Sequence, residues 1–480
     1  MNIYFVTLGC DKNLVDSEKM LGILSQRGYN FTEDLEAADI AVVNTCCFIR
    51  DAQKESVGSI LDLADRKKDG KLKALIVTGC LAQRYREDIL KEVPEVDAVL
   101  GTTSLPEIAD VVTEILDKDG KTGKSSPDSA PSPAAAKAAG TSDGTAGIVS
   151  LTPLSRPVHG GEKRVLSTGT CTEYLKIAEG CSKRCTYCVI PDVRGPYRSV
   201  PMDELLEEAR TLASQGVKEL ILVAQETTLY GIDLYGKKML PELLRKLCRI
   251  DGFRWIRILY CYPEEITDEL IDVMASEPKI LHYIDMPIQH ASDDILRKMG
   301  RKTNRKELEE RIAAIRAKIP DVCLRTTLIS GFPTETETDH RHLLAFVRKE
   351  KFDRLGDFTY SKEDGTPAAK MKPQVKASEK KRRRAEIMEA QQKIAFAKAR
   401  RMKGRNLTAL IEGRLTEEAM DSSDFDGRNV YVARTYMDAP EVDGMLFLPS
   451  DYELMSGDFV NVKITGSRGY DLIGEVTGRA

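Results

Sequence analysis

Short apolar runs rich in β-branched residues alternate with polar, helix-compatible sequence through the first hundred residues. NIYFVTL at 2–8, IAVVN at 40–44 and KALIVT at 73–78 are such runs, and helix-compatible stretches such as SEKMLGILSQRG follow them. A helix between two strands returns the chain to the start of the next strand, so this alternation is typical of a parallel sheet. It predicts a parallel α/β domain over residues 1–117.

The alternation returns after residue 171. Six further apolar runs, separated by helical patterns, are expected as strands near 173–178, 219–224, 255–260, 281–286, 322–329 and 354–360. Six strand–helix units in series predict an open or partial parallel barrel, a partial (β/α)6 barrel, over residues 171–375.

The last hundred residues follow two other patterns. Residues 376–403 are highly charged and helix-compatible, and Gly404 is a helix-stop signal, so a connecting helix is expected there. Residues 404–480 alternate apolar and polar positions in short runs broken by Gly, Asp and Pro. This second pattern predicts a small antiparallel β-barrel.

Residues 118–170 carry neither pattern. Much of the segment is rich in Ser, Pro, Ala, Gly and Thr, as in KTGKSSPDSAPSPAAAKAAGTSDGTAG. Such a composition buries too little apolar surface to offset the entropy of ordering the chain. We therefore expect a flexible linker between the first two domains.

The overall charge balance does not select a partner. Basic residues number 71 and acidic residues 75, for a net charge of −4. No apolar stretch is long enough for a membrane span, and the start, MNIYFVTLGC, lacks the basic and apolar regions of a signal peptide. We expect a cytoplasmic protein with no membrane partner, whose eleven cysteines serve metal or redox chemistry rather than disulfides.

The stretch AEGCSKRCTYCVIP at 178–191 places Cys181, Cys185 and Cys188 within eight positions. A closed zinc site or a fully protein-ligated iron–sulfur cluster uses four protein ligands, so three cysteines leave one metal position for a substrate or cofactor. The alternatives are a zinc site completed by a remote residue and a redox pair of Cys185 and Cys188. No second CxxC lies at zinc-finger spacing, however, and the redox pair leaves the third cysteine unexplained.

A second set of three cysteines is dispersed along the first domain. Cys10, Cys46 and Cys80 each follow the carboxyl end of an expected strand, in VTLGC, VVNTC and IVTGC. In a parallel sheet these ends share one edge, where ligands bind, so the three thiols are expected to converge. Buried cysteines also suit strand ends by size alone, but that explanation predicts no regular placement. Cys47 should project away from Cys46, because neighbouring residues in extended chain face opposite ways.

The C-x3-C-x2-C triplet after the first barrel strand resembles the signature of radical S-adenosylmethionine enzymes. The resemblance implies a [4Fe–4S] cluster on Cys181, Cys185 and Cys188, with S-adenosylmethionine chelating the iron that lacks a protein ligand. It also implies cleavage of S-adenosylmethionine to a 5′-deoxyadenosyl radical, which abstracts hydrogen from an unactivated carbon. Tyr187 matches the aromatic position that this family places beside the adenine, and ordinary packing is the alternative role.

Nearly the whole chain outside 118–170 resembles the methylthiotransferases, and most closely the RimO-type enzymes, which modify the β-carbon of an aspartate in a small-subunit ribosomal protein. The stretches that carry the resemblance are TLGCDKNLVDSE at 7–18, NTCCFI at 44–49, LVAQETTLYGIDL at 222–234, DMPIQHASDDILRKMGR at 285–301, SGFPTETE at 330–337, SKEDGTPA at 361–368 and ARTYMDAPEVDG at 433–444. Three positions depart from the family pattern: Cys47 and Thr334 stand where glycine is usual, and Glu226 where aspartate is usual.

The resemblance implies two [4Fe–4S] clusters, with the one on Cys10, Cys46 and Cys80 supplying or carrying the sulfur. It also implies an external electron donor and a TRAM-like C-terminal barrel that docks the substrate. Three further residues match positions near S-adenosylmethionine, and ordinary polar roles at strand ends are the alternative. They are Glu226, whose carboxylate suits the ligand's ammonium group, Gln289 and Arg325.

Two other functions remain open at this point. One is a tRNA adenosine methylthiotransferase of the same architecture, and the other is a non-catalytic iron–sulfur scaffold or electron carrier. Residues 404–480 contain fourteen acidic and seven basic residues, a net charge of −7. A domain of this sign repels a phosphate backbone and complements a basic protein. We therefore expect a ribosomal protein as the partner rather than tRNA, although acidic surface can also serve solubility alone.

Overall fold

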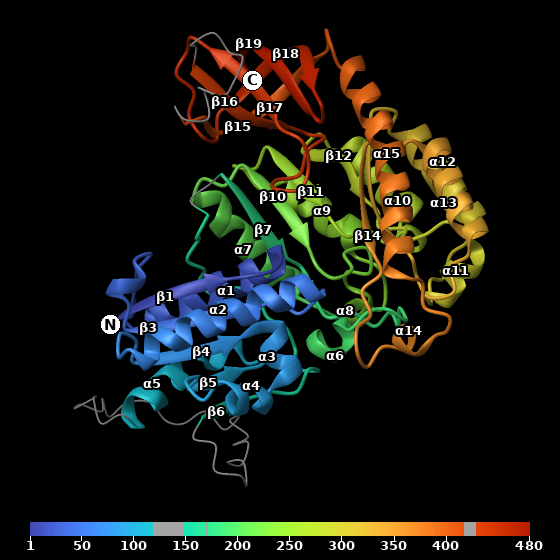
Figure 1. The fold of residues 1–480 in the computed structure, drawn as a ribbon. Coiled ribbons are helices and arrows are strands. Elements are labelled where there is room, and N and C mark those ends of the chain that lie inside the picture. The colour runs from blue at the N-terminus through green and yellow to red at the C-terminus, as the bar shows by residue number, and fades with distance from the viewer. Residues whose placement is uncertain (119–146, 169–170, 417–428) are drawn as a thin grey trace. The chain divides into compact units, whose positions relative to one another are not determined.

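In a computed structural model, residues 1–118, 147–168, 171–416 and 429–480 are described. The chain divides into two compact units (Figure 1). Unit 1 comprises residues 1–167, 178–183 and 188–205, and unit 2 comprises residues 168–177, 184–187 and 206–480. Each unit contains a six-stranded parallel sheet.

The sheet of unit 1 has the strand order β2-β1-β3-β4-β5-β6, and every neighbouring pair is parallel. Its strands are β1 (Asn2–Thr7), β2 (Asn30–Phe31), β3 (Ile40–Thr45), β4 (Ala74–Thr78), β5 (Ala98–Leu100) and β6 (Ile148–Ser150). The helices are α1 (Asp11–Gln26), α2 (Arg50–Lys68), α3 (Gly79–Tyr85), α4 (Glu87–Glu92), α5 (Ile108–Lys118) and α6 (Ile190–Arg194). Short antiparallel strands β8 (Ala178–Glu179) and β9 (Arg198–Ser199) precede and follow α6.

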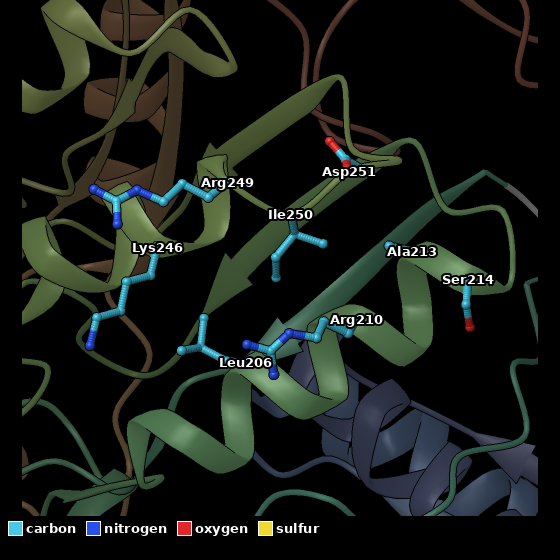
Figure 2. A pocket seen from close by; sticks show the side chains of 8 residues that line it. All are labelled: Leu206, Arg210, Ala213, Ser214, Lys246, Arg249, Ile250 and Asp251. Atoms are coloured by element: carbon cyan, nitrogen blue, oxygen red, sulfur yellow. The ribbon is translucent and has the colours of Figure 1, made fainter.

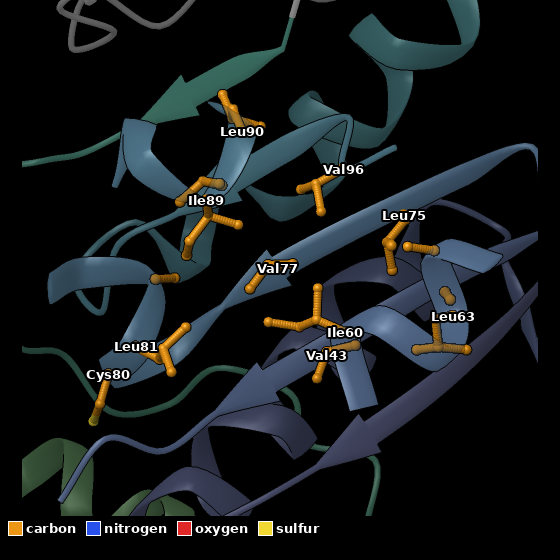
Figure 3. Close-up of a cluster of buried hydrophobic side chains, with 14 of the residues drawn as sticks. Val43, Ile60, Leu63, Leu75, Val77, Cys80, Leu81, Ile89, Leu90 and Val96 are labelled. Carbon is orange, nitrogen blue, oxygen red and sulfur yellow. The ribbon is translucent and has the colours of Figure 1, made fainter. Parts of the chain in front are cut away.

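Both faces of this sheet are buried. All six residues of β3 are buried, and successive side chains face opposite sides. Val43 packs on one side with residues of α2, α3 and α4, such as Ile60 and Leu81 (Figure 3). Ile40 and Val42 pack on the other side with α1 and α5. Strands covered on both faces read as continuous apolar runs, which explains why the sequence pattern located them.

The predicted flexible linker at 118–170 is shorter than expected at its C-terminal end. Its residues 119–146 lie outside the described residues. Beyond them, β6 pairs in parallel with β5, and Arg164, only 7% exposed, forms an ion pair with Glu18 at 2.5 Å. The run IVS is too short to stand out as a strand among glycines and threonines, so its pairing is set by the neighbouring edge of the sheet.

The sheet of unit 2 has the order β14-β13-β12-β11-β10-β7, again with parallel neighbours. Its strands are β7 (Thr172–Lys176), β10 (Glu219–Val223), β11 (Trp255–Ile258), β12 (Ile280–Asp285), β13 (Cys323–Ser330) and β14 (Arg354–Thr359). The helices are α7 (Met202–Ser214), α8 (Ile232–Tyr235), α9 (Leu240–Cys248), α10 (Asp268–Ser276), α11 (Asp293–Lys298), α12 (Arg305–Lys318), α13 (Glu337–Glu350), α14 (Pro367–Lys370) and α15 (Ala377–Arg401). This confirms the expected series of six strand–helix units. Among the helices of the described segments, none combines the length and apolar character that a membrane crossing requires.

The C-terminal strands close a barrel in the order β15-β16-β17-β19-β18. They are β15 (Asn406–Arg414), β16 (Asn429–Thr435), β17 (Leu446–Ser450), β18 (Phe459–Arg468) and β19 (Asp471–Arg479). The predicted small barrel is confirmed, with one difference: β17 and β19 pair in parallel, while the other four ladders are antiparallel. In a closed barrel with an odd number of strands, the strand directions cannot alternate at every neighbour. At least one pair of neighbouring strands must therefore be parallel.

Within unit 2, buried ion pairs join the C-terminal barrel to the amino edge of the parallel sheet. Arg434 of β16 is 2% exposed and lies 2.7 Å from Glu219, the first residue of β10. Arg257 of β11 contacts the same carboxylate at 2.8 Å. Burial by itself raises the pKa of Glu219, but Arg434 and Arg257 outweigh it and hold the pKa below its usual value. Trp255, which begins β11, packs edge to face on Phe459 of the barrel, with ring centroids 4.9 Å apart.

Candidate functional site

The three dispersed cysteines lie at the carboxyl edge of the unit 1 sheet. Cys10 immediately precedes α1, Cys46 follows the last residue of β3, and Cys80 is the second residue of α3, which begins where β4 ends. The strands β1, β3 and β4 are neighbours in the sheet. The fold therefore brings three residues that are far apart in sequence to one edge, as the strand pattern predicts.

Glycines before two of these cysteines allow close approach to the end of β3. Gly9 has a φ of +102°, and a Cβ there would lie 2.7 Å from the Cβ of Cys46. Gly79 has a φ of +91°, and a Cβ there would lie 2.5 Å from the carbonyl oxygen of Thr45. Only glycine tolerates both the positive φ and the lack of space. The sequences LGC and TGC thus pack both neighbouring loops against the segment that carries Cys46.

The three thiols share a partly enclosed environment. Cys10 is exposed, whereas Cys46 and Cys80 are 7% and 8% exposed. Burial raises the pKa of Cys46 and raises that of Cys80 to about 12, while the nearby cation Arg194 opposes both shifts. Cys10 acts electrostatically on both thiols, so all three lie within one local field. Cys47 also acts on Cys80, and both belong to the apolar cluster, at whose margin Figure 3 shows Cys80.

Arg194, a buried residue at the end of α6, lies against Cys80. It is 1% exposed, and its Nε donates a hydrogen bond to Cys80 Sγ over 3.2 Å. Its Nη1 contacts Asp16 at 2.6 Å and Glu179 at 3.1 Å, and its Nη2 donates to Asn13. The sequence analysis did not identify this group. Its members lie beside the two cysteine motifs, in DKNLVD, AEGC and IPDVRG, but only the fold pairs them.

The cysteine triplet lies in the loop between β8 and α6. Cys181 and Cys185 are each 7% exposed, and Cys188 is partly exposed. Cys181 and Cys188 belong to unit 1, where the Cys181 backbone nitrogen donates to Gly195 at 3.0 Å. Cys185 belongs to the short segment 184–187 of unit 2.

This segment is held against the end of α11. The backbone nitrogen of Thr186 donates to the carbonyl oxygen of Met299 at 2.9 Å, and its hydroxyl donates to that of Lys298 at 2.7 Å. A Cβ on Gly300 would lie 2.9 Å from the carbonyl oxygen of Arg184, so the two backbones are close. Residue 301 therefore directly follows Lys298, Met299 and Gly300, the residues that contact the triplet loop.

Residue 301 is a buried arginine with unused donors. Arg301 contacts Glu264 at 3.2 Å and lies 4.2 Å from the ring centroid of Tyr262. Its Nε and Nη1 are buried and have no hydrogen-bond partner among the described residues. Burial disfavours its charge, yet its pKa is raised overall because Tyr187, Glu264, Tyr262 and Cys185 act in the opposite direction. Sequence analysis did not single out Arg301, although it ends the stretch DMPIQHASDDILRKMGR.

Of the four residues expected near S-adenosylmethionine, Glu226 and Gln289 lie in loops that follow strands of the unit 2 sheet, and Tyr187 lies in the cysteine-triplet loop. Tyr187 packs edge to face on Phe332, with ring centroids 6.5 Å apart. Glu226 is fully buried three residues after β10, and its Oε1 accepts a hydrogen bond from the backbone nitrogen of Thr228 at 3.0 Å. Gln289 lies four residues after β12, with a φ of +68°.

Arg325 has a different setting. It is the third residue of β13, near the amino end of that strand, and its Nη1 lies 2.7 Å from Asp285. Its Nε lies 3.7 Å from Asp443 of the C-terminal barrel. The structure therefore gives Arg325 two carboxylate partners and places it within β13, beside Asp285 at the carboxyl end of β12. Contact of any of the four with S-adenosylmethionine remains a prediction.

The dispersed cysteines supply the type of ligand that iron–sulfur clusters use. Across the described ranges, no three His, Cys, Asp or Glu side chains come close enough together to hold one metal ion. In an iron–sulfur cube each thiolate binds a different iron, so the ligand sulfurs stand farther apart than around one ion. Thiols at one sheet edge, two of them shielded from water, fit that donor set.

A cavity of about 670 Å³ opens at the surface of unit 2 between α7 and α9 (Figure 2). The residues that line it are Leu206, Arg210, Ala213, Ser214, Lys246, Arg249, Ile250 and Asp251. It includes none of the cysteines or expected S-adenosylmethionine contacts, and the last turns of α7 and α9 lead into the amino ends of β10 and β11. The cavity therefore lies toward the amino edge of the unit 2 sheet, and no candidate site residue lines it.

Three family models match successive parts of the chain. They are the Uncharacterized protein family UPF0004 at residues 2–101, the Radical SAM superfamily at 175–347 and the TRAM domain at 404–477. Among solved structures, the chain is similar to the radical S-adenosylmethionine methyltransferase TsrM from Kitasatospora setae, with a TM-score of 0.54 and 15% identity over 76% of each chain. It is also similar to the cobalamin-dependent enzyme OxsB, with a TM-score of 0.51 and 13% identity over 77% of this chain and 54% of that one. At these identities the likeness concerns the fold alone.

Curated relatives match the chain from end to end. A protein of Lachnoclostridium phytofermentans named ribosomal protein uS12 methylthiotransferase RimO is 56% identical over 99% of both chains. Proteins of the same name from Acetivibrio thermocellus and Clostridioides difficile are 46% and 44% identical, over at least 97% of each chain. Identity of this extent, together with the three domain matches, shows that the chain belongs to the RimO family of radical S-adenosylmethionine methylthiotransferases.

Proposed function

We propose that this chain attaches a methylthio group to the β-carbon of an aspartate in ribosomal protein uS12. The observation that carries the proposal is the 56% identity over 99% of both chains with a relative named for modification of uS12. The two sets of three cysteines agree with a reaction that needs both a radical and a sulfur source. S-adenosylmethionine and [4Fe–4S] clusters are the cofactors of this family.

In this proposal, Cys181, Cys185 and Cys188 hold one cluster and Cys10, Cys46 and Cys80 hold the other. When bound, the clusters and S-adenosylmethionine supply one-electron chemistry, the methyl group and the sulfur.

The side chains around them bind and orient. Tyr187 flanks the adenine, with its ring held by Phe332, and Glu226 meets the ammonium group of S-adenosylmethionine from a fully buried position. Gln289 and Arg325 are proposed as further contacts. The burial of Cys46 and Cys80 keeps water away from the auxiliary site.

The substrate-docking domain is proposed to be the barrel at 404–480. Its net charge of −7 is complementary to a basic ribosomal protein. Arg434, one of its seven basic residues, is buried in ion pairs and adds little to its surface. We therefore assign the partner as uS12 rather than tRNA, with an external reductant, in the cytoplasm.

The domain division that accompanies this proposal follows the sequence boundaries. Residues 1–117 carry the auxiliary cluster, 118–170 connect, 171–375 form the radical domain, 376–403 the connecting helix and 404–480 the docking barrel.

The test uses the full-length chain, because the barrel's Arg434 and Asp443 are buried against residues of the parallel sheet. The protein, reconstituted with iron and sulfide, is incubated with S-adenosylmethionine, dithionite and either uS12 or tRNA. Mass spectrometry is expected to find a methylthio group on a uS12 aspartate and none on tRNA. Methylthiolated adenosine with unmodified uS12 would assign the chain to the tRNA enzymes.

The same incubation also tests the non-catalytic alternative. A scaffold or electron carrier would retain iron and show cluster absorbance without forming 5′-deoxyadenosine. Formation of 5′-deoxyadenosine together with modified uS12 excludes that alternative.

A further inference from the structure

Arg194 contributes a buried positive charge to the auxiliary site. Its Nε hydrogen bond to Cys80 is 3.2 Å long, and the guanidinium is 1% exposed. Hydrogen bonds and charges beside cluster sulfurs are among the main factors that set the reduction potential of an iron–sulfur cluster. Solvent screening is weak at such a depth, so the site feels the charge of Arg194 together with the opposing charges of its partners Asp16 and Glu179.

The same guanidinium orders the chain on both sides of the triplet. Glu179 lies two residues before Cys181, and Arg194 lies six residues after Cys188. Their contact at 3.1 Å ties the two ends of this segment together within unit 1, while Asp16 and Asn13 tie them to α1 behind Cys10. One side chain thus contacts residues associated with both cysteine motifs.

We propose that Arg194 is a positioning residue for the auxiliary cluster: it fixes the Cys80 sulfur by the Nε hydrogen bond and makes the reduction potential of that cluster more positive. This role rests on the proposed cluster at Cys10, Cys46 and Cys80. A cation beside the ligand stabilises the more negative, reduced form, and Asp16, which pairs with the same guanidinium, acts in the opposite direction.

The test isolates the auxiliary cluster in the full-length chain by replacing Cys181, Cys185 and Cys188 with Ala. After reconstitution with iron and sulfide, the reduction potential is measured by redox titration followed by electron paramagnetic resonance. Arg194→Met is expected to lower the reduction potential by about 59 mV or more. This shift corresponds to at least a tenfold change in the equilibrium constant of one-electron reduction. Arg194→Lys keeps the charge and loses the planar fork, so its shift should be smaller.

Two further variants separate this role from a structural one. Asp16→Asn removes a buried negative charge and is expected to raise the potential, opposite in sign to Arg194→Met. Arg164→Met is the matched control, because Arg164 is also a buried arginine of unit 1 and is paired with a carboxylate, Glu18. Its potential should equal that of the parent.

Three results would overturn the inference. Equal shifts in Arg194→Met and Arg164→Met would show a general effect of losing a buried cation. Shifts of the same sign in Asp16→Asn and Arg194→Met would also contradict it. If Arg194→Met does not retain a cluster, Arg194→Lys and Asp16→Asn provide the test. Their reduction potentials should shift in opposite directions, and shifts of the same sign would contradict the inference. Absence of any cluster in the triplet variant would remove the proposed auxiliary site itself, an outcome distinct from an unchanged potential.

Discussion

The two sets of cysteines are built in opposite ways. Cys10, Cys46 and Cys80 come from three strand ends and are brought to one edge only when the unit 1 sheet is complete. Cys181, Cys185 and Cys188 lie within one eight-residue loop. The first set therefore depends on long-range folding, whereas the second depends mainly on local chain geometry and the anchoring of its loop.

The arginines near the two sets of cysteines differ in how fully the protein pairs their hydrogen-bond donors. Arg194, beside Cys80, uses its Nε, Nη1 and Nη2 on partners from the protein. Arg301, near Cys185, keeps buried Nε and Nη1 donors with no partner among the described residues. A buried donor without a protein partner is costly, so a ligand that offered acceptors to Arg301 would be favoured there. The comparison indicates that the proposed auxiliary site is preformed, whereas the proposed radical site has donors that a cofactor could satisfy.

The strongest test of this comparison is cysteine replacement. Changing Cys181, Cys185 or Cys188 to Ala should reduce 5′-deoxyadenosine formation more than a hundredfold, because the cluster that cleaves S-adenosylmethionine is lost. Cys10→Ala should retain that cleavage and lose methylthio transfer. Chromatographic assay of 5′-deoxyadenosine beside mass spectrometry of uS12 measures both. Equal loss of S-adenosylmethionine cleavage in the triplet variants and in Cys10→Ala would contradict the proposal that the two cysteine sets have different roles.

Arg301→Met sharpens the contrast on the radical side. Two buried charged donors that pair with the ligand contribute about 3 kcal/mol, so S-adenosylmethionine affinity should fall about a hundredfold. Equilibrium dialysis with the anaerobic, cluster-loaded chain measures this. Lys302→Met, at the exposed next residue, is the control and should bind like the parent. Unchanged affinity in Arg301→Met would mean that its free donors serve no ligand.

The loop that supports Tyr187 should respond to pH. Burial raises the pKa values of Glu335 and Asp357 to about 7, and Ser330 donates to Asp357 at 2.6 Å. A carboxyl with a raised folded-state pKa favours folding most below its unfolded pKa and loses that contribution as pH rises to about 7. As the pH rises from 5 to 8, the parent should therefore lose about 2 kcal/mol of unfolding free energy that Asp357→Asn does not lose.

Fluorescence of the single tryptophan, Trp255, during urea unfolding measures that difference in unit 2. Asp353→Asn serves as a comparison at a carboxylate that is ion-paired with Lys398 at 2.6 Å. A pH-independent difference between Asp357→Asn and the parent would contradict the raised pKa.

The smallest expected effect concerns Thr334 in the same loop. Thr334 has a φ of +70°, and its hydroxyl is buried without a partner among the described residues. The left-handed conformation costs a β-branched residue about 1–2 kcal/mol, and glycine avoids this cost. Glycine also has more freedom in the unfolded chain, which offsets part of the gain. Thr334→Gly should stabilise unit 2 by about 1 kcal/mol in the same urea assay. Destabilisation would show that the threonine side chain supports the loop.

Much of this fold was predictable because strands such as β3, β4 and β10 are buried on both faces and therefore form continuous apolar runs. The observed β10, β12 and β13 begin and end within one residue of the expected positions. The strand β6 was missed because three residues among glycines carry no pattern, and its place is decided by the edge of β5.

The placement of Cys10, Cys46 and Cys80 at strand ends was also predictable, but the arginines beside the cysteines were not. Arg194 and Arg301 resemble surface residues in the sequence, since a buried arginine is recognised only through partners that lie far away along the chain. Asp16 and Arg194 are 178 residues apart. The setting of Arg325 depends likewise on Asp443, a residue of another domain.

The joint between the C-terminal barrel and the parallel sheet also bears on how this family could change substrates. Arg354 depends on the barrel for its carboxylate partner Asp438, while Glu219 and Arg325 each have one partner in the sheet and one in the barrel, Arg434 and Asp443. A barrel taken from an RNA-modifying relative would leave Arg354 unmatched, and Glu219 and Arg325 with one partner fewer, unless positions 434, 438 and 443 were inherited with it. Because an unmatched buried charge costs several kcal/mol, new specificity is expected to arise on the outer loops of the barrel, with its seam held constant.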